Sequence, residues 1–123
     1  MKKNNLVYIK HILDAISQIE EYVQGISHKD FISNKMVQDA VIRQIEIIGE
    51  ATKNLSKEVK EKYKDTPWRK MAGMRDKLVH GYFGVDLEAV WEAVEKDIPA
   101  LRKRIKSIIG KEEKYEQNFA NKK

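Results

Sequence analysis

Hydrophobic residues recur every three or four positions through most of the chain, and no stretch alternates between apolar and polar residues with a period of two. The first stripe consists of Leu6, Ile9, Ile12, Ile16, Ile19 and Val23. It predicts a helix that ends near Gly25, because glycine readily adopts the left-handed conformation that closes many helices. Phe31 and Ile32 are expected to pack the next connection against the core.

A second stripe predicts one long helix from about residue 33 to about residue 63, with Ser33 as its N-cap. Its core face consists of Val37, Val41, Ile45, Ile48, Thr52, Leu55 and Val59. Ile42 and Ile47 widen this face, and a helix that is apolar over more than one face usually has more than one neighbour. Gly49 would let another helix approach closely. The surplus of apolar surface hints at a subunit interface.

A short third helix is predicted after Asp65-Thr66-Pro67, with Thr66 as its cap and Pro67 in the first helical position. It is expected to end near His80-Gly81. Its core face consists of Trp68, Met71, Ala72, Leu78 and Val79.

A fourth helix is predicted after Asp86, which would cap it. Pro99 lies inside this helix, so we expect a kink or a restart near Asp97. The helix is expected to end at Gly110, ahead of a polar tail. Its apolar positions are Leu87, Val90, Trp91, Val94, Ile98, Leu101, Ile105 and Ile108.

The predicted fold is therefore all-α: an up-and-down helical bundle of three longer helices plus a short one. The chain has 123 residues, 41% of them hydrophobic and 35% charged, which suits one folded domain, residues 1–110, followed by the polar tail 111–123. The chain contains no cysteine, which excludes disulfides and thiolate sites and fits a reducing cytosol. Because polar residues interrupt the apolar positions after the basic start, we expect neither a signal peptide nor a membrane span, and a cytoplasmic location.

The net charge of +5 favours a polyanionic partner only weakly, because basic and acidic residues are interspersed. Carboxylates such as Glu46 and Glu50 lie on polar helix faces and are expected to be solvated. His11 and His28 have no local partner and are interpreted as surface residues. The three histidines do not have the spacing of metal ligands, and motifs for bound cofactors are missing, so the sequence predicts no metal site and no cofactor.

Arg75 departs from the pattern of the third helix, since it is seven residues from Trp68 and three from Leu78 and so falls on the apolar face. A guanidinium there is costly unless it reaches solvent, pairs with a carboxylate from another helix, or opens into a cleft. His80 follows five residues later, about 140° around an ideal helix. The two side chains could therefore converge only if the helix ends or distorts near His80, or if a second subunit completes the site.

The segment Arg75-Asp76-Lys77-Leu78-Val79-His80-Gly81-Tyr82 resembles the R-x-x-x-x-H-x-Y motif of the HEPN superfamily, and more narrowly the HepT-like toxin family. The resemblance extends to residues 67–74 and 83–87 and to the run 45–51, and it covers roughly residues 5–110.

The resemblance implies a homodimer in which Arg75 and His80 of both subunits line a shared cleft and cut RNA without a metal, with Asp76 as a supporting polar residue. It further implies a toxin of a type VII toxin–antitoxin system. The partner there is a minimal nucleotidyltransferase antitoxin, which silences the toxin by attaching AMP to the motif tyrosine, here Tyr82. The alternative is a non-catalytic HEPN module that binds nucleotide or RNA, or a structural partner of a nucleotidyltransferase.

These residue types suit RNA cleavage, because RNA carries its own nucleophile in the 2′-hydroxyl. Histidine, with a reference pKa of about 6.5, can accept or donate a proton near neutrality. Arginine supplies a fixed charge and planar donors that match phosphate oxygens. One chain offers only one such histidine, His80, whereas a dimer would offer a base and an acid from two symmetry-related copies.

Overall fold

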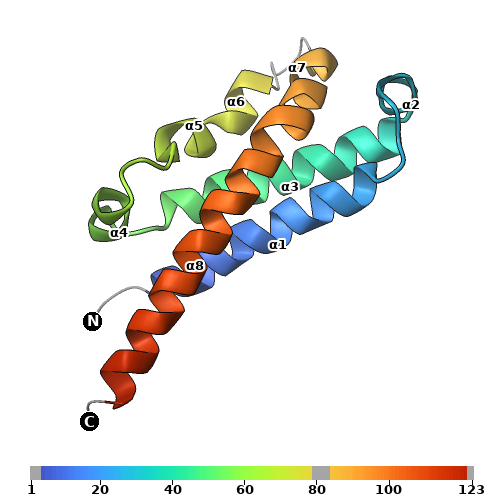
Figure 1. Cartoon of the computed structure of the whole chain (residues 1–123). Coiled ribbons are helices and arrows are strands. Elements are labelled where there is room, and N and C mark those ends of the chain that lie inside the picture. Colours follow the sequence, from blue (N-terminus) through green and yellow to red (C-terminus); the bar gives the residue numbers. More distant parts are fainter. Residues whose placement is uncertain (1–3, 79–83, 122–123) are drawn as a thin grey trace.

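Helices account for almost all of the regular structure in the computed structural model, which describes residues 4–78 and 84–121. Helices α1 (Asn5–Val23) and α3 (Lys35–Lys53) run side by side in opposite directions, as Figure 1 shows. Helix α8 (Ile98–Asn121) packs on α1, and the short helices α5 (Trp68–Ala72) and α6 (Met74–Leu78) pack on α3. No β-strand occurs among the described residues, so the prediction of an all-α bundle is confirmed. The predicted homodimer stays a prediction.

The first predicted helix is confirmed, and Gly25 follows it with a φ of +74°, in the left-handed conformation expected of it. Phe31 is fully buried, as predicted, but it lies in a short additional helix, α2 (His28–Ser33). Ser27 and Asp30 form a capping box at the start of α2, in which each side chain accepts a hydrogen bond from the other residue's backbone N–H.

The single long helix predicted for residues 33–63 is wrong, although the core stripe along it is buried as expected from Val41 to Val59, and Val37 is partly buried. Asn34 rather than Ser33 caps α3, because its side chain accepts a hydrogen bond from the Val37 N–H at 3.1 Å. A break after Lys53 separates α3 from α4 (Lys57–Lys62), and Ser56 caps α4. Asn5 fixes this break, since its side chain bonds both the Ser56 N–H, at 2.9 Å, and the Ser56 hydroxyl, at 3.0 Å.

The predicted third helix is also divided, at Gly73, into α5 and α6. Thr66 does not cap it: its hydroxyl is buried and has no hydrogen-bond partner among the described residues, and Pro67 occupies the cap position without a side-chain bond. Gly49 does let a neighbouring helix approach, as predicted. A Cβ atom at Gly49 would lie 3.2 Å from the backbone oxygen of Ala72, so α5 packs directly on the backbone of α3.

The fourth predicted helix begins as expected, with the Asp86 side chain accepting a hydrogen bond from the Ala89 N–H at 3.1 Å at the start of α7 (Leu87–Glu92). A π-helical turn, η2 (Ala93–Asp97), then precedes Pro99 and confirms the predicted distortion. The predicted end at Gly110 is wrong, because α8 continues without a break to Asn121.

Side-chain pairs hold the first turns of α8 beyond Gly110 against the bundle. Glu112 pairs with Lys62 at 2.8 Å, and Glu113 pairs with Lys10 at 2.9 Å. Tyr63 donates a hydrogen bond to Glu112, and burial together with this bond raises the pKa of the Tyr63 phenol. The division into a domain of residues 1–110 and a polar tail of residues 111–123 stays a prediction.

No helix in the described part of the chain is both long enough and apolar enough to cross a lipid bilayer.

Candidate functional site

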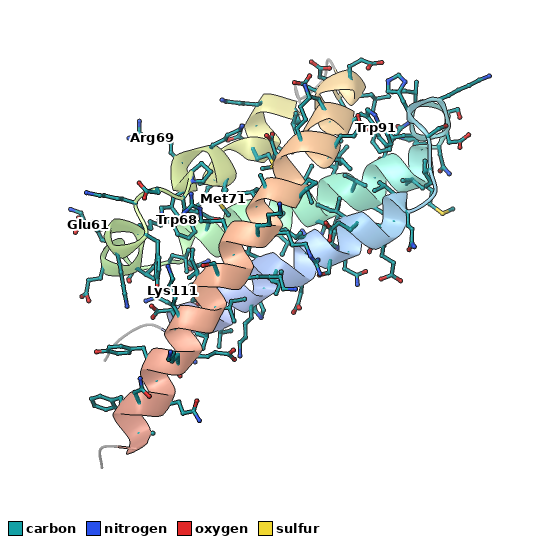
Figure 2. The ribbon with its side chains drawn as sticks, in the orientation of Figure 1. Glu61, Trp68, Arg69, Met71, Trp91 and Lys111 are labelled. Atoms are coloured by element: carbon teal, nitrogen blue, oxygen red, sulfur yellow. The ribbon has the colours of Figure 1, made fainter. Side chains whose placement is uncertain are left out.

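Arg75 lies on α6 beside α3, at the edge of the buried face rather than in its middle. The prediction that it sits on the apolar stripe is therefore wrong: its side chain is 46% exposed. The buried face of α5 and α6 instead continues through Met71, Met74 and Leu78, and Figure 2 shows Met71 directed toward the bundle. Met74 belongs to this buried face, although the predicted face left it out. Arg75 therefore lies at the border of the face, where it contacts Glu46 on α3.

Arg75 pairs with two carboxylates. Its Nε atom lies 3.3 Å from Oε2 of Glu46 on α3, and its Nη1 atom lies 3.7 Å from Oδ1 of Asp76. Pairing with a carboxylate from another helix is one of the alternatives that the sequence left open, and the structure confirms it. The Glu46 contact engages Nε and the Asp76 contact engages Nη1, so the two carboxylates meet different nitrogens of the guanidinium.

Glu46 was expected to be a solvated surface residue, and this expectation is wrong, because its side chain is only 33% exposed and is held against Arg75. A sequence signal for this contact does exist. Glu46 and Gly49 are three residues apart and so share one face of α3, and Gly49 marks where α5 meets that face. A carboxylate one turn from such a glycine is placed to meet a cation on the incoming helix.

A polar cavity of about 240 Å³ opens beside the Arg75–Glu46 pair. Helix α3 contributes Glu46, Gly49, Glu50 and Lys53 to its wall, and the α5–α6 segment contributes Ala72, Arg75 and Asp76. A recess of this size has room for a phosphate group. Arg75 is thus a half-exposed cation in a recess that a ligand can reach.

His80 and Tyr82, the other predicted site residues, lie outside the described residues, as do Val79 and Gly81. The described part of α6 runs as far as Leu78. The chain is held on both sides of this segment, because the Asp86 N–H donates a hydrogen bond to the Leu78 carbonyl at 2.8 Å. Whether Arg75 and His80 converge therefore stays a prediction.

The other two histidines take no part in the cavity. His28 is exposed, as predicted, but it does have a distant partner: its Nε2 atom lies 2.7 Å from Glu88 on α7, and its ring meets the edge of Trp91. His11 packs edge-on against Tyr8. Within residues 4–78 and 84–121, no three His, Cys, Asp or Glu side chains are grouped so as to hold a metal ion.

Comparison with known proteins identifies the family. The model of the family described as Ribonuclease HepT-like matches residues 12–108. The chain belongs to the HepT-like ribonuclease family. The match covers both walls of the polar cavity and the whole of the Arg75–Tyr82 motif.

Three relatives of this HepT-like chain illustrate the similarity. "Probable ribonuclease HepT" of Thermococcus cleftensis is 45% identical over 108 residues, which are 88% of this chain and 98% of that one. "Putative RNase TTE0752" of Caldanaerobacter subterraneus is 49% identical over 105 residues, 85% of this chain and 94% of that one. "Gamma-glutamylcyclotransferase and putative RNase MJ0434" of Methanocaldococcus jannaschii is 50% identical over 121 residues, 98% of this chain but 54% of that one, so this chain spans about half of its length. No solved structure matches the chain significantly.

Proposed function

We propose that this HepT-like chain is a metal-independent endoribonuclease that cleaves RNA with Arg75 and His80. The observation that carries the proposal is the position of Arg75 on α6, half-exposed at the wall of a polar cavity and five residues before His80 in the sequence. An arginine placed in this way can bind a phosphodiester, and the motif supplies a histidine close to it along the chain.

The reaction needs one proton to leave and one to arrive. The 2′-oxygen of the RNA attacks the adjacent phosphorus as its proton passes to a neutral imidazole, while the bond from phosphorus to the 5′-oxygen breaks and that oxygen takes a proton from an imidazolium. Arg75 would stabilise the charge that develops on the phosphate oxygens. Because each chain supplies only one histidine at the motif, the proposal includes a homodimer in which two copies of His80 share these roles.

Regulation by a partner belongs to the same proposal. The chain would act in the cytoplasm as the toxin of a type VII toxin–antitoxin system, and a minimal nucleotidyltransferase would silence it by attaching AMP to Tyr82. Asp76, 3.7 Å from Nη1 of Arg75, would help to orient the guanidinium. The second candidate is a non-catalytic module that binds nucleotide or RNA, and the two carboxylates that already balance the charge of Arg75 favour it.

Purified protein tests the function directly. We expect the full chain, expressed without the partner, to form a dimer and to cleave single-stranded RNA in the presence of EDTA, because the proposed groups need no metal. Product ends distinguish this chemistry, since attack by the 2′-oxygen leaves a 2′,3′-cyclic phosphate on one fragment and a 5′-hydroxyl on the other. Intact RNA at every enzyme concentration, with RNA binding retained, would favour the non-catalytic module.

Glu46 is proposed as a positioning residue that holds Arg75. We expect Glu46→Gln to lower kcat about tenfold, since loss of the ion pair lets the guanidinium leave its productive orientation. KM for RNA should stay the same or fall, because a carboxylate that competes with the substrate phosphate is removed. The free energy of unfolding should change little, as expected of a partly exposed pair.

Glu50→Gln is the matched control for this variant. Glu50 lines the same cavity from the next turn of α3, and its carboxylate pairs with no cation among the described residues. It should keep the wild-type kcat. Equal loss of kcat in Glu46→Gln and Glu50→Gln, or a rise in KM with kcat unchanged in Glu46→Gln, would show that Glu46 does not position Arg75.

A further inference from the structure

A second concave surface lies on α5, α6 and the connection that precedes α5, and its lining is rich in cations. This groove, of about 730 Å³, is lined by Lys64, Arg69, Lys70 and Lys77 together with uncharged residues, and we refer to it as the basic groove. Its described lining contains no carboxylate. In Figure 2 the Arg69 side chain extends away from the bundle, whereas its neighbour Trp68 is directed into it.

Most of the positive charge in the basic groove is not balanced. Lys70 pairs with Asp97 at 3.3 Å, but Lys64, Arg69 and Lys77 form no ion pair with any described residue. Several cations elsewhere on the chain do have acidic partners, for example Arg102 with Glu20 at 2.6 Å. Three unpaired cations around one concave surface produce a local positive potential, which attracts a polyanion more strongly than the net charge of +5 alone suggests.

The basic groove adjoins the Arg75 cavity through the same two short helices. Gly73 and Lys77 line the groove. Ala72, which precedes Gly73, and Arg75, two residues before Lys77, line the cavity. A chain of phosphates that crosses α5 and α6 can therefore contact both. This continuity favours an RNA strand over an acidic protein surface as the occupant.

We propose that the basic groove binds the phosphate backbone of the RNA substrate, on one side of the bond that is cut. The inference rests on the proposed function, because it assigns to the groove the same RNA that Arg75 and His80 would cleave. Lys64, Arg69 and Lys77 contact phosphates and do not read bases, so they contribute affinity that depends on salt but not on sequence.

Binding of an uncleavable RNA tests the proposal apart from catalysis. The probe is a fluorescent single strand of about 20 nucleotides, longer than typical single-strand site sizes, in which 2′-O-methyl groups block the attacking oxygen. The groove variant combines Lys64→Gln, Arg69→Gln and Lys77→Gln. The control variant combines Lys29→Gln, Lys57→Gln and Lys114→Gln, which removes the same charge from exposed residues outside the groove.

We expect the groove variant to bind the probe at least about tenfold more weakly at low salt than the control variant. The slope of log K against log salt concentration should be shallower by about 2, from roughly 0.7 for each lost phosphate contact. Thermal unfolding should be unchanged, because the three side chains are exposed and unpaired. Equal affinity and slope in the two variants would overturn the proposal, as would a groove variant whose only change is dissociation of the oligomer.

Cleavage assays separate this proposal from the proposed function. With a dinucleotide, which is too short to occupy the groove, the groove variant should cleave as fast as the control variant. With long RNA its KM should rise and its kcat should hold. If wild-type protein cleaves RNA and the two variants behave alike, the groove assignment fails and the nuclease stands. If no variant cleaves RNA but the groove variant alone loses binding, the nuclease fails and the groove assignment stands.

Discussion

Replacing His80 with alanine is expected to lower the rate of RNA cleavage by about 10²- to 10⁴-fold, the usual cost of losing a general acid–base group. In the proposed dimer the change removes both the group that accepts the 2′-proton and the group that protonates the 5′-oxygen. The wild-type rate should pass through a maximum with pH, because one imidazole must be neutral and the other charged. His80→Ala should abolish that maximum along with the rate. The measurement is the initial rate on a labelled RNA across pH, in EDTA.

Arg75→Ala is the companion variant, and the structure changes what we expect of it. A place on the apolar face would have made the variant prone to misfold. Since Arg75 is 46% exposed and its pair with Glu46 is also partly exposed, the loss in unfolding free energy should be small, about 1 kcal/mol or less. Its cleavage rate should fall about 10²- to 10³-fold, as when one preorganised donor to a developing oxyanion is lost. Activity that chelators stop and both variants retain would identify a metal-dependent mechanism instead.

Periodicity and local capping predicted the parts of the fold that depend on near neighbours in sequence. The buried stripes of α1 and α3, the cap at Asp86 and the distortion before Pro99 were all predicted correctly. The division between α3 and α4 was not, because Asn5, 51 residues away, forms the hydrogen bonds that stabilise it. The apolar stripe continues through Leu55 and Val59 across this break, so periodicity alone could not reveal it.

The candidate site was predictable to a similar extent. The motif identified Arg75, and Gly49 correctly marked where another helix packs on α3. The partner of Arg75 was missed, because a carboxylate on a polar helix face cannot be told from a solvated one until the neighbouring helix is placed. The break at Gly73 has the same origin, since its N–H bonds the Arg69 carbonyl at 3.1 Å and α6 then starts anew. The basic groove was missed for a related reason: interspersed charges concealed that Lys64, Arg69, Lys70 and Lys77 line one concave surface.

Co-expression with a minimal nucleotidyltransferase of the proposed kind is expected to add an AMP-sized mass to the chain and to reduce RNA cleavage to the level of His80→Ala. The proposed acceptor is Tyr82, two residues beyond His80. An AMP group there would carry a phosphate to the region where the RNA backbone must bind. Because the Arg75 side chain is 46% exposed, its guanidinium could pair with this phosphate, and a charge-assisted contact of that kind competes directly with the substrate.

Intact-mass measurement on three chains decides whether Tyr82 is the acceptor. Tyr82→Phe should gain no mass and should stay active in the presence of the nucleotidyltransferase. Tyr115→Phe is the matched control, because Tyr115 is 62% exposed yet lies far along α8 from the motif, and it should be modified and silenced like the wild type. If Tyr82→Phe is silenced without a mass increment, the partner inhibits by binding alone. If Tyr82→Phe still gains the increment, another of the five tyrosines or a different residue is the acceptor, and the competition between AMP and RNA at Arg75 loses its basis.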